Sequence, residues 1–124
     1  MTPSARSLRV LRERGYHAEV VERWIPGANI RRDLYNWIDI VSVHPTLGIL
    51  GVQVSTSSHR AERIAKARLS PGLLAWHLAG GRLAFHGWRK LKNRWVLTEI
   101  ELGREHLIDG ATPGPAPAPL EGGY

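Results

Sequence analysis

The side chains most able to do chemistry lie on either side of a short turn. Asp39 stands in the hydrophobic run WIDIVSV, and Gln53 and Ser55 follow in a second run, ILGVQVS. If residues 44–48 form the loop of a hairpin, Asp39 lies directly opposite Gln53. Directly opposed residues have Cβ atoms about 4.5 to 5.5 Å apart on one face, close enough for both to bind one metal ion. Period-2 alternation places Ser55 on that face too.

The same register fixes the rest of the hairpin. Val43 then pairs with Ile49, and Val41 pairs with Gly51, which lies on the Asp39 face and is expected to leave space there. The opposite face is expected to be apolar, because it takes Leu50, Val52 and Val54.

A purely structural interpretation of these residues is also open. An aspartate inside a strand can accept hydrogen bonds from neighbouring backbone, or from Arg31 or Arg32, because buried carboxylates rarely lack partners. Gln53 can equally be a packed core amide.

The elements that position these residues are marked by caps and turn residues. Thr2, Pro3 and Gly15 are typical of the start and end of a helix, and Ser70 with Pro71 begins another. The expected elements are a helix at 2–15, strands at 17–24, 37–43 and 49–55, helical segments at 59–69 and 70–79, and strands at 82–88 and 95–102. Residues 31–36 are expected to be a polar connection. This order predicts an α/β sheet flanked by helices.

Composition narrows the chemistry. The chain has 124 residues and no cysteine, which excludes disulfides, thiolate metal ligands and cysteine nucleophiles. Seventeen Lys and Arg against eleven Asp and Glu give a net charge of +6, which favours a polyanionic partner such as nucleic acid.

We expect one folded domain at residues 1–109 and a Pro/Gly-rich disordered tail at 110–124. No apolar run suits a membrane span and no signal peptide is readable, so a cytoplasmic location is expected.

The pattern of Asp39, a short turn and then Gln53-Val54-Ser55 resembles the PD-(D/E)XK nuclease superfamily, whose members show D, a spacer and E-x-K. The element order over residues 2–102 also resembles that superfamily's restriction-endonuclease-like αβββαβ core, which has a mixed central sheet flanked by helices. Small archaeal and phage Holliday junction resolvase-like proteins look nearest. The motif departs from the family at Ile38, Gln53 and Ser55, which stand where the family has Pro, an acidic residue and Lys.

The resemblance implies that Asp39 and Gln53 hold Mg²⁺ or Mn²⁺, which polarises a scissile phosphate and activates water. Since glutamine removes one negative charge, a further carboxylate is expected to help; Asp33 and Glu19 are favoured over Glu13 and Glu22. Ser55 occupies the position of the family's lysine, and Lys66 on the following helix is expected to replace that lysine.

Basic residues suggest where DNA would bind. Arg60, Arg63 and Lys66 recur at three-residue spacing along one helix face. The segment HGWRKLKNRW mixes cations with two tryptophans, and its basic turn is assigned to the DNA backbone, as is Arg32: the cations of the turn are Arg89, Lys90, Lys92 and Arg94. Trp88 and Trp95 are assigned to packing, and the alternative for the whole segment is a solvated hairpin turn whose two tryptophans pair across the strands into the core. His59 is a further candidate base or phosphate ligand.

The sequence thus predicts a metal-dependent DNA endonuclease that selects branched or other structured DNA and acts as a homodimer. The alternative is a catalytically inactive DNA-binding module that keeps the nuclease-like fold, to which Gln53 and Ser55 both point. A third interpretation is a protein-interaction or assembly factor whose basic charge is incidental.

Overall fold

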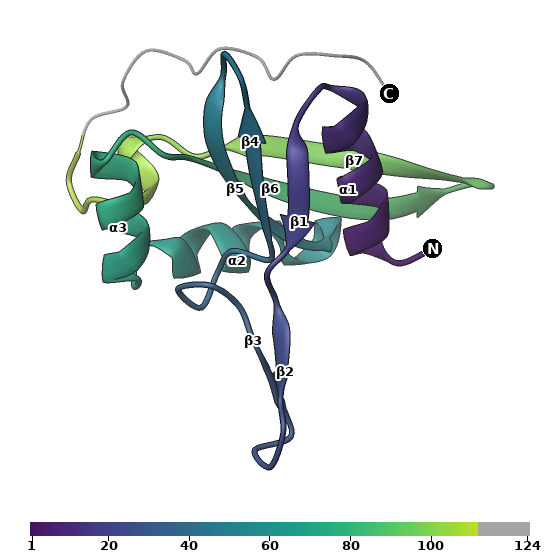
Figure 1. Cartoon of the computed structure of the whole chain (residues 1–124), viewed down its shortest axis with the longest axis horizontal. Helices are drawn as coiled ribbons and strands as arrows, with labels where there is room; N and C mark the ends of the chain where they lie inside the picture. The colour runs from purple at the N-terminus through teal and green to yellow at the C-terminus, as the bar shows by residue number, and fades with distance from the viewer. Residues whose placement is uncertain (112–124) are drawn as a thin grey trace.

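A five-stranded mixed sheet organises the computed structural model, which describes residues 1–111 (Figure 1). Its strand order is β1-β4-β5-β6-β7, in which only β5 and β6 run parallel. The strands are β1 (His17–Val20), β4 (Ile40–His44), β5 (Gly48–Thr56), β6 (Arg82–Leu91) and β7 (Arg94–Glu101). The α/β class predicted from the sequence is confirmed. Most of the predicted tail, from residue 112 on, lies outside the described residues.

Helices cover both faces of this sheet. Helix α1 (Pro3–Glu13) packs through Leu11 on one face, and α2 (Arg60–Ala67) and α3 (Pro71–Leu78) pack through Ala67 and Leu73 on the other. The short 3₁₀ helices η1 (Ser57–His59) and η2 (Arg104–His106) complete the described elements. No helix among residues 1–111 has the length and apolar character needed to cross a membrane.

The predicted helix caps are confirmed. The hydroxyl of Thr2 accepts a hydrogen bond from the backbone N–H of Ala5 at 3.1 Å, and that of Ser70 accepts one from Leu73 at 3.3 Å. Gly15 follows the end of α1 with a φ of 94°, a conformation that favours glycine. These local signals therefore fix where α1 ends and α3 begins.

The register of the central hairpin is also confirmed. Val43 pairs with Ile49, and Val41 with Gly51. His44 pairs with Gly48 as well, so the loop shortens to residues 45–47. The predicted apolar face of β5 packs beneath α1. The expected free space beside Gly51 is wrong, because a Cβ there would lie 2.6 Å from the Cδ1 of Ile38, whose side chain fills the position.

The predicted strand at 17–24 is instead two strands. The chain leaves the sheet after β1 and forms β2 (Arg23–Ile25), which pairs antiparallel with β3 (Ile30–Arg32). Residues 31–36 are therefore not simply a polar connection. The predicted strand at 37–43 starts only at Ile40, because the preceding chain turns between the bridged residues Leu34 and Ile38. The β2–β3 ribbon, left without a partner in the main sheet, projects away from it (Figure 1).

The predicted basic turn at 89–94 is mostly paired strand. Leu91 pairs with Arg94, so the turn is only Lys92 and Asn93. Trp88 lies opposite Leu97 and Trp95 lies opposite Lys90, so the direct cross-strand pairing of the two tryptophans is wrong. Trp88 is buried, whereas Trp95 is 40% exposed and lies 4.6 Å beneath the guanidinium of Arg6. Trp88 therefore packs in the core, whereas Trp95 packs at the surface against Arg6.

A buried polar network fastens α1 to the sheet. The Nε2 of His86 lies 2.6 Å from the carboxylate of Glu99, and its Nδ1 lies 2.9 Å from the hydroxyl of Ser7. Trp88 donates to that hydroxyl at 2.9 Å, and Arg14 donates to Glu99 at 2.7 Å. The set resembles a hydrolase triad, but Ser7 and His86 are completely buried, so its role is structural.

This network predicts a response to acid. Burial alone would raise the pKa of Glu99, but hydrogen bonds from His86 and Arg14 outweigh it, and the pKa is lowered. A carboxyl group with a depressed folded-state pKa stabilises the fold above its unfolded pKa, and this contribution is lost as the pH falls through the folded value. We expect the wild type to lose stability below about pH 4 more steeply than Glu99→Gln. Urea unfolding from pH 7 to pH 3 measures this difference, and parallel profiles would contradict it.

Candidate metal centre

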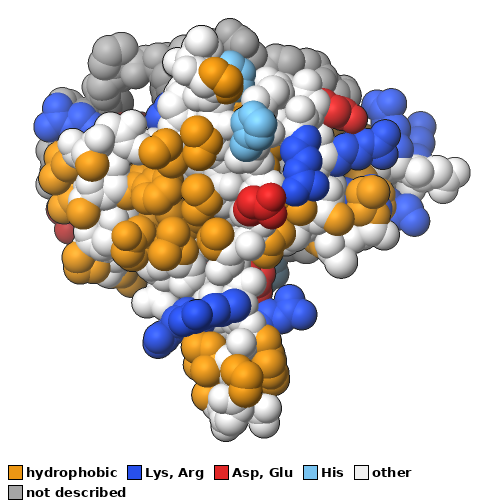
Figure 2. Space-filling model, in the orientation of Figure 1, with side chains coloured by type: hydrophobic (Ala, Val, Ile, Leu, Met, Phe, Trp, Pro, Cys, Tyr) orange, Lys and Arg blue, Asp and Glu red, His pale blue; other side chains and the backbone are white. Residues whose placement is uncertain are grey.

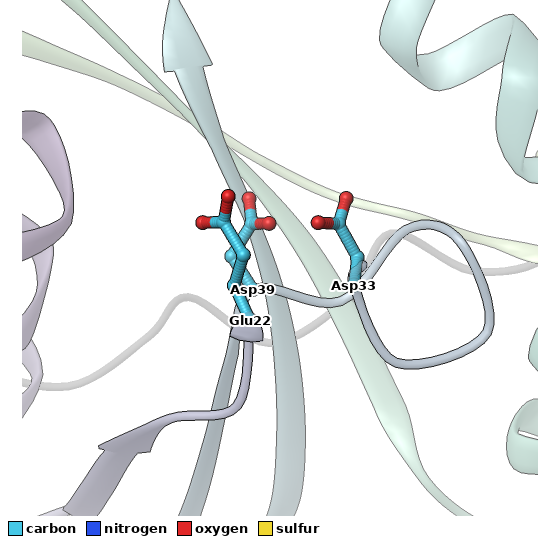
Figure 3. A group of neighbouring side chains, drawn as sticks. All are labelled: Glu22, Asp33 and Asp39. Atoms are coloured by element: carbon cyan, nitrogen blue, oxygen red, sulfur yellow. The ribbon is translucent and has the colours of Figure 1, made fainter. Parts of the chain in front are cut away.

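Three carboxylates meet where the β2–β3 ribbon joins the sheet. Oxygen atoms of Glu22, Asp33 and Asp39 all lie within 4.8 Å of one another. Figure 3 shows the three carboxyl groups on neighbouring segments, pointing in the same general direction. Glu22 directly precedes β2, Asp33 directly follows β3, and Asp39 directly precedes β4. We call this set the carboxylate cluster.

Strand pairing explains why these residues meet. Arg23 pairs with Arg32, so the same register carried one step toward the sheet places Glu22 opposite Asp33. The backbone N–H of Glu22 lies 3.4 Å from the carbonyl oxygen of Asp39 and that of Val21 lies 2.8 Å from the same atom. The start of the ribbon is thereby held against the start of β4.

The environment of Asp39 disfavours an unpaired negative charge. The residue is only 5% exposed, and one of its carboxylate oxygens accepts a hydrogen bond from the N–H of Val54 at 2.7 Å. Burial raises the pKa of Asp39 to about 8, with the charges of Asp33 and Glu22 adding to the rise and the hydrogen bond from Val54 opposing it. A cation bound among the three groups would offset both causes of this rise.

The donor set suits a hard divalent cation. Mg²⁺ and Mn²⁺ prefer oxygen ligands, and the cluster offers only carboxylate oxygens. Among the described residues, the cation paired with the cluster is Arg31, whose guanidinium lies 3.7 Å from the carboxylate of Glu22 but is largely exposed. An exposed arginine compensates little of the repulsion near the buried Asp39, so these residues fit a bound metal ion.

Gln53 is held by a hydrogen bond within the core. The β4–β5 pairing ends at Ile40 with Val52, and the backbone N–H of Asp39 donates to the carbonyl oxygen of Val52 at 2.8 Å, so the predicted direct pairing of Asp39 with Gln53 lies outside the regular ladder. The side-chain amide of Gln53 is buried and donates to the carbonyl oxygen of Trp37. That contact matches the packed-amide alternative, and ligation by Gln53 stays a prediction.

Of the four carboxylates considered as helpers of Asp39, two lie in the carboxylate cluster and two lie elsewhere. Asp33 lies in the cluster, and so does Glu22, which the sequence interpretation did not favour. Glu19 lies elsewhere: its side chain is 85% exposed and its carboxylate is 4.0 Å from Arg12. Glu13 forms an ion pair with Arg9 on α1.

The remaining predicted catalytic residues lie on β5 and α2. Ser55 is half-buried and pairs with Gly87 of the neighbouring strand β6. Lys66 is exposed, and within residues 1–111 it makes no ion pair with the carboxylate cluster at 4.0 Å or less. His59 lies 3.4 Å from Glu62, one turn along its own helical segment.

The predicted DNA contacts are largely accessible. Arg63 is half-buried on α2, and its backbone carbonyl accepts a hydrogen bond from the indole of Trp37 at 2.8 Å. The other predicted DNA-binding residues are all exposed: Arg32, Arg60, Arg89, Lys90, Lys92 and Arg94.

Glu22 is the site residue that the sequence interpretation undervalued. The segment RWIPGANIRR carries Pro-Gly between two short β-prone stretches, which is a hairpin signal. Folding that segment about its centre places Glu22 opposite Asp33 and would have selected it over Glu19. The assumption of one continuous strand at 17–24 concealed this pairing.

No family model, curated protein or solved structure matches this chain. The chemistry open to the protein therefore follows from its own residues. Three clustered carboxylates beside a hydrophobic sheet, on a strongly basic chain, are suited to holding a divalent cation next to a phosphate group.

Proposed function

We propose that the protein is a metal-dependent DNA endonuclease with a restriction-endonuclease-like core. The observation that carries the proposal is the carboxylate cluster at the end of the β4–β5 hairpin, the place where the D…QxS pattern leads one to expect a metal site. Glu22 supports this proposal because it supplies a negative charge that Gln53 lacks. The flanking helices and mixed sheet are compatible with the family core.

In the proposed site, Asp39, Asp33 and Glu22 hold Mg²⁺ or Mn²⁺. The amide nitrogen of Gln53 donates to Trp37, so its oxygen is the atom it would offer as a ligand. The bound metal would polarise the scissile phosphate and lower the pKa of the attacking water. Burial of Asp39 keeps bulk water from screening its charge.

Basic side chains supply the remaining functions. Lys66 on α2 is proposed to stabilise negative charge on the phosphate in place of the family's lysine, with Ser55 as a polar neighbour on β5. The exposed cations of the β6–β7 hairpin and α2 are proposed to bind the DNA backbone. Selection of branched DNA and action as a homodimer belong to the same proposal.

The second candidate is a DNA-binding module that has lost catalysis. Two observations favour it: the amide of Gln53 is engaged with Trp37, and the lysine position of the motif holds Ser55. Such a module would bind DNA in a salt-dependent way without any need for metal.

Cleavage of labelled linear, flapped and four-way-junction DNA distinguishes the two candidates. With Mg²⁺ or Mn²⁺ we expect wild-type cleavage that EDTA abolishes, and Asp39→Asn should reduce the rate by about a hundredfold or more. A bound metal contributes several kcal/mol to the transition state, and about 1.4 kcal/mol changes a rate tenfold. Tight binding without cleavage by either protein would instead favour the inactive module.

A further inference from the structure

A two-stranded arm projects from the sheet beside the carboxylate cluster (Figure 1). We define the arm as residues 23–32, which comprise β2, β3 and the residues that connect them. Its sequence, RWIPGANIRR, contains three arginines and no acidic residue. Figure 2 shows cationic side chains where the arm meets the body and hydrophobic side chains toward its tip.

The arm carries an exposed aromatic side chain on the same face as the cluster. Trp24 pairs directly with Arg31, so the two side chains lie on one face of the ribbon. Alternation along each strand places Glu22 and Asp33 on that face as well. The 3.7 Å contact between Arg31 and Glu22 agrees with this placement. Two residues of strand span about 7 Å, so Trp24 lies a short step from the carboxylates along the arm.

Trp24 remains unusually open for its residue type. It is 54% exposed, and nearby Ile30 is 48% exposed. A tryptophan offers a large flat apolar surface whose burial is favourable, so its exposure beside a polar site indicates a partner that covers it.

The positive charge of the arm favours nucleic acid as the partner that covers Trp24. The arm's arginines, Arg23, Arg31 and Arg32, are all exposed. Pairing the arm with the arm of a second copy would bring like charges together, whereas nucleic acid offers both phosphates for the arginines and base faces for the tryptophan. A base that is already unpaired can stack on an aromatic ring without the cost of opening a duplex.

We propose that the arm binds the unpaired or branched region of a nucleic acid, with Trp24 stacked on a base, Arg31 on an adjacent phosphate and Arg32, from the opposite face of the ribbon, on a further phosphate. This inference deepens the proposed nuclease function, and it rests on that function in taking nucleic acid as the substrate. It assigns the selection of branched or flapped substrates to the arm and not to the carboxylate cluster.

Binding of the full chain to fluorescently labelled flapped DNA and to a matched uninterrupted duplex tests the stacking role. Measured by anisotropy in EDTA, Trp24→Ala should bind the flapped DNA about tenfold more weakly and the duplex almost unchanged. Trp24→Phe should retain most of the affinity. Leu78→Ala, which alters a side chain 70% exposed on α3, is the matched control and should bind as the wild type.

The salt dependence of the same binding tests the arginines. Arg32→Ala should weaken binding to both DNAs and reduce the salt slope by about one, whereas Arg104→Ala, an exposed arginine in η2, should not. Unchanged flap affinity in Trp24→Ala and Arg32→Ala would overturn the proposal. So would conversion of a wild-type dimer to a monomer by Trp24→Ala in sedimentation, with flap affinity unaltered, because the arm would then bind a second copy.

The two proposals fail in different ways. If no metal supports cleavage but Trp24→Ala still weakens flap binding, the arm assignment stands and the nuclease assignment falls. If the wild type cleaves and both arm variants bind and cleave as it does, the arm assignment falls alone.

Discussion

Asp39→Asn is expected to make the metal-free protein more stable than the wild type at pH 9. Asparagine keeps an oxygen that accepts the hydrogen bond from Val54, but it removes the buried negative charge. In the wild type the folded-state pKa of about 8 exceeds the ordinary value of 3.8, so the contribution of Asp39 to stability is greatest at low pH and falls as the pH rises between these values. The variant lacks this loss, and its melting temperature at pH 9 should be higher by several degrees.

Bound metal should make the wild type more stable than Asp39→Asn, which reverses the order of stability expected without metal. A cation that binds the folded wild type stabilises it by mass action, whereas the variant has lost a ligand. Thermal or urea unfolding at pH 5 and pH 9, with EDTA or with millimolar Mn²⁺, measures both effects. The account of the cluster would be contradicted if Mn²⁺ raised the stability of both proteins equally, or if the wild type were as stable at pH 9 as at pH 5 in EDTA.

His86→Ala is expected to cause the largest loss of stability among the proposed variants, about 3 to 5 kcal/mol, because it removes two hydrogen bonds from a buried polar network. Glu99 would lose its contact with His86 at 2.6 Å and keep the one with Arg14, and the hydroxyl of Ser7 would lose the Nδ1 of His86 and keep the indole of Trp88. A cavity beneath α1 adds to the cost.

Urea unfolding at pH 7 measures the effect of His86→Ala against a matched control. His59 is exposed and lies near only Glu62 of its own helical segment, so His59→Ala should change stability by less than about 0.5 kcal/mol. A loss below about 1 kcal/mol in His86→Ala would show that the network does not fasten α1 to the sheet.

Features encoded by neighbouring residues were predictable from the sequence. The caps at Thr2 and Ser70 and the register of the central hairpin depend on short-range geometry, and each is confirmed. Chain position led us to favour Asp33 and Glu19 as helpers of Asp39, and of these two Asp33 lies in the carboxylate cluster.

Features that depend on distant segments were not predictable in this way. Ser7 and His86 are 79 residues apart, and nothing local to either residue indicates their contact.

The arm is a local hairpin, and it was missed because one continuous strand was assumed at residues 17–24, although Pro26 and Gly27 mark a turn. Glu22 was undervalued for the same reason, since the register of that hairpin is what brings it to Asp33.

The nuclease account is tested most directly by comparing two glutamates that differ in position alone. Glu22 lies in the carboxylate cluster, whereas Glu19, three residues earlier, points to solvent beside Arg12. In single-turnover cleavage of flapped and four-way-junction DNA with Mn²⁺, the wild type and Glu19→Gln should cut at similar rates, and Glu22→Gln should be slower by about a hundredfold or more. Equal cleavage by all three proteins, or no metal-dependent cleavage by the wild type, would contradict the assignment of the cluster as the catalytic metal centre.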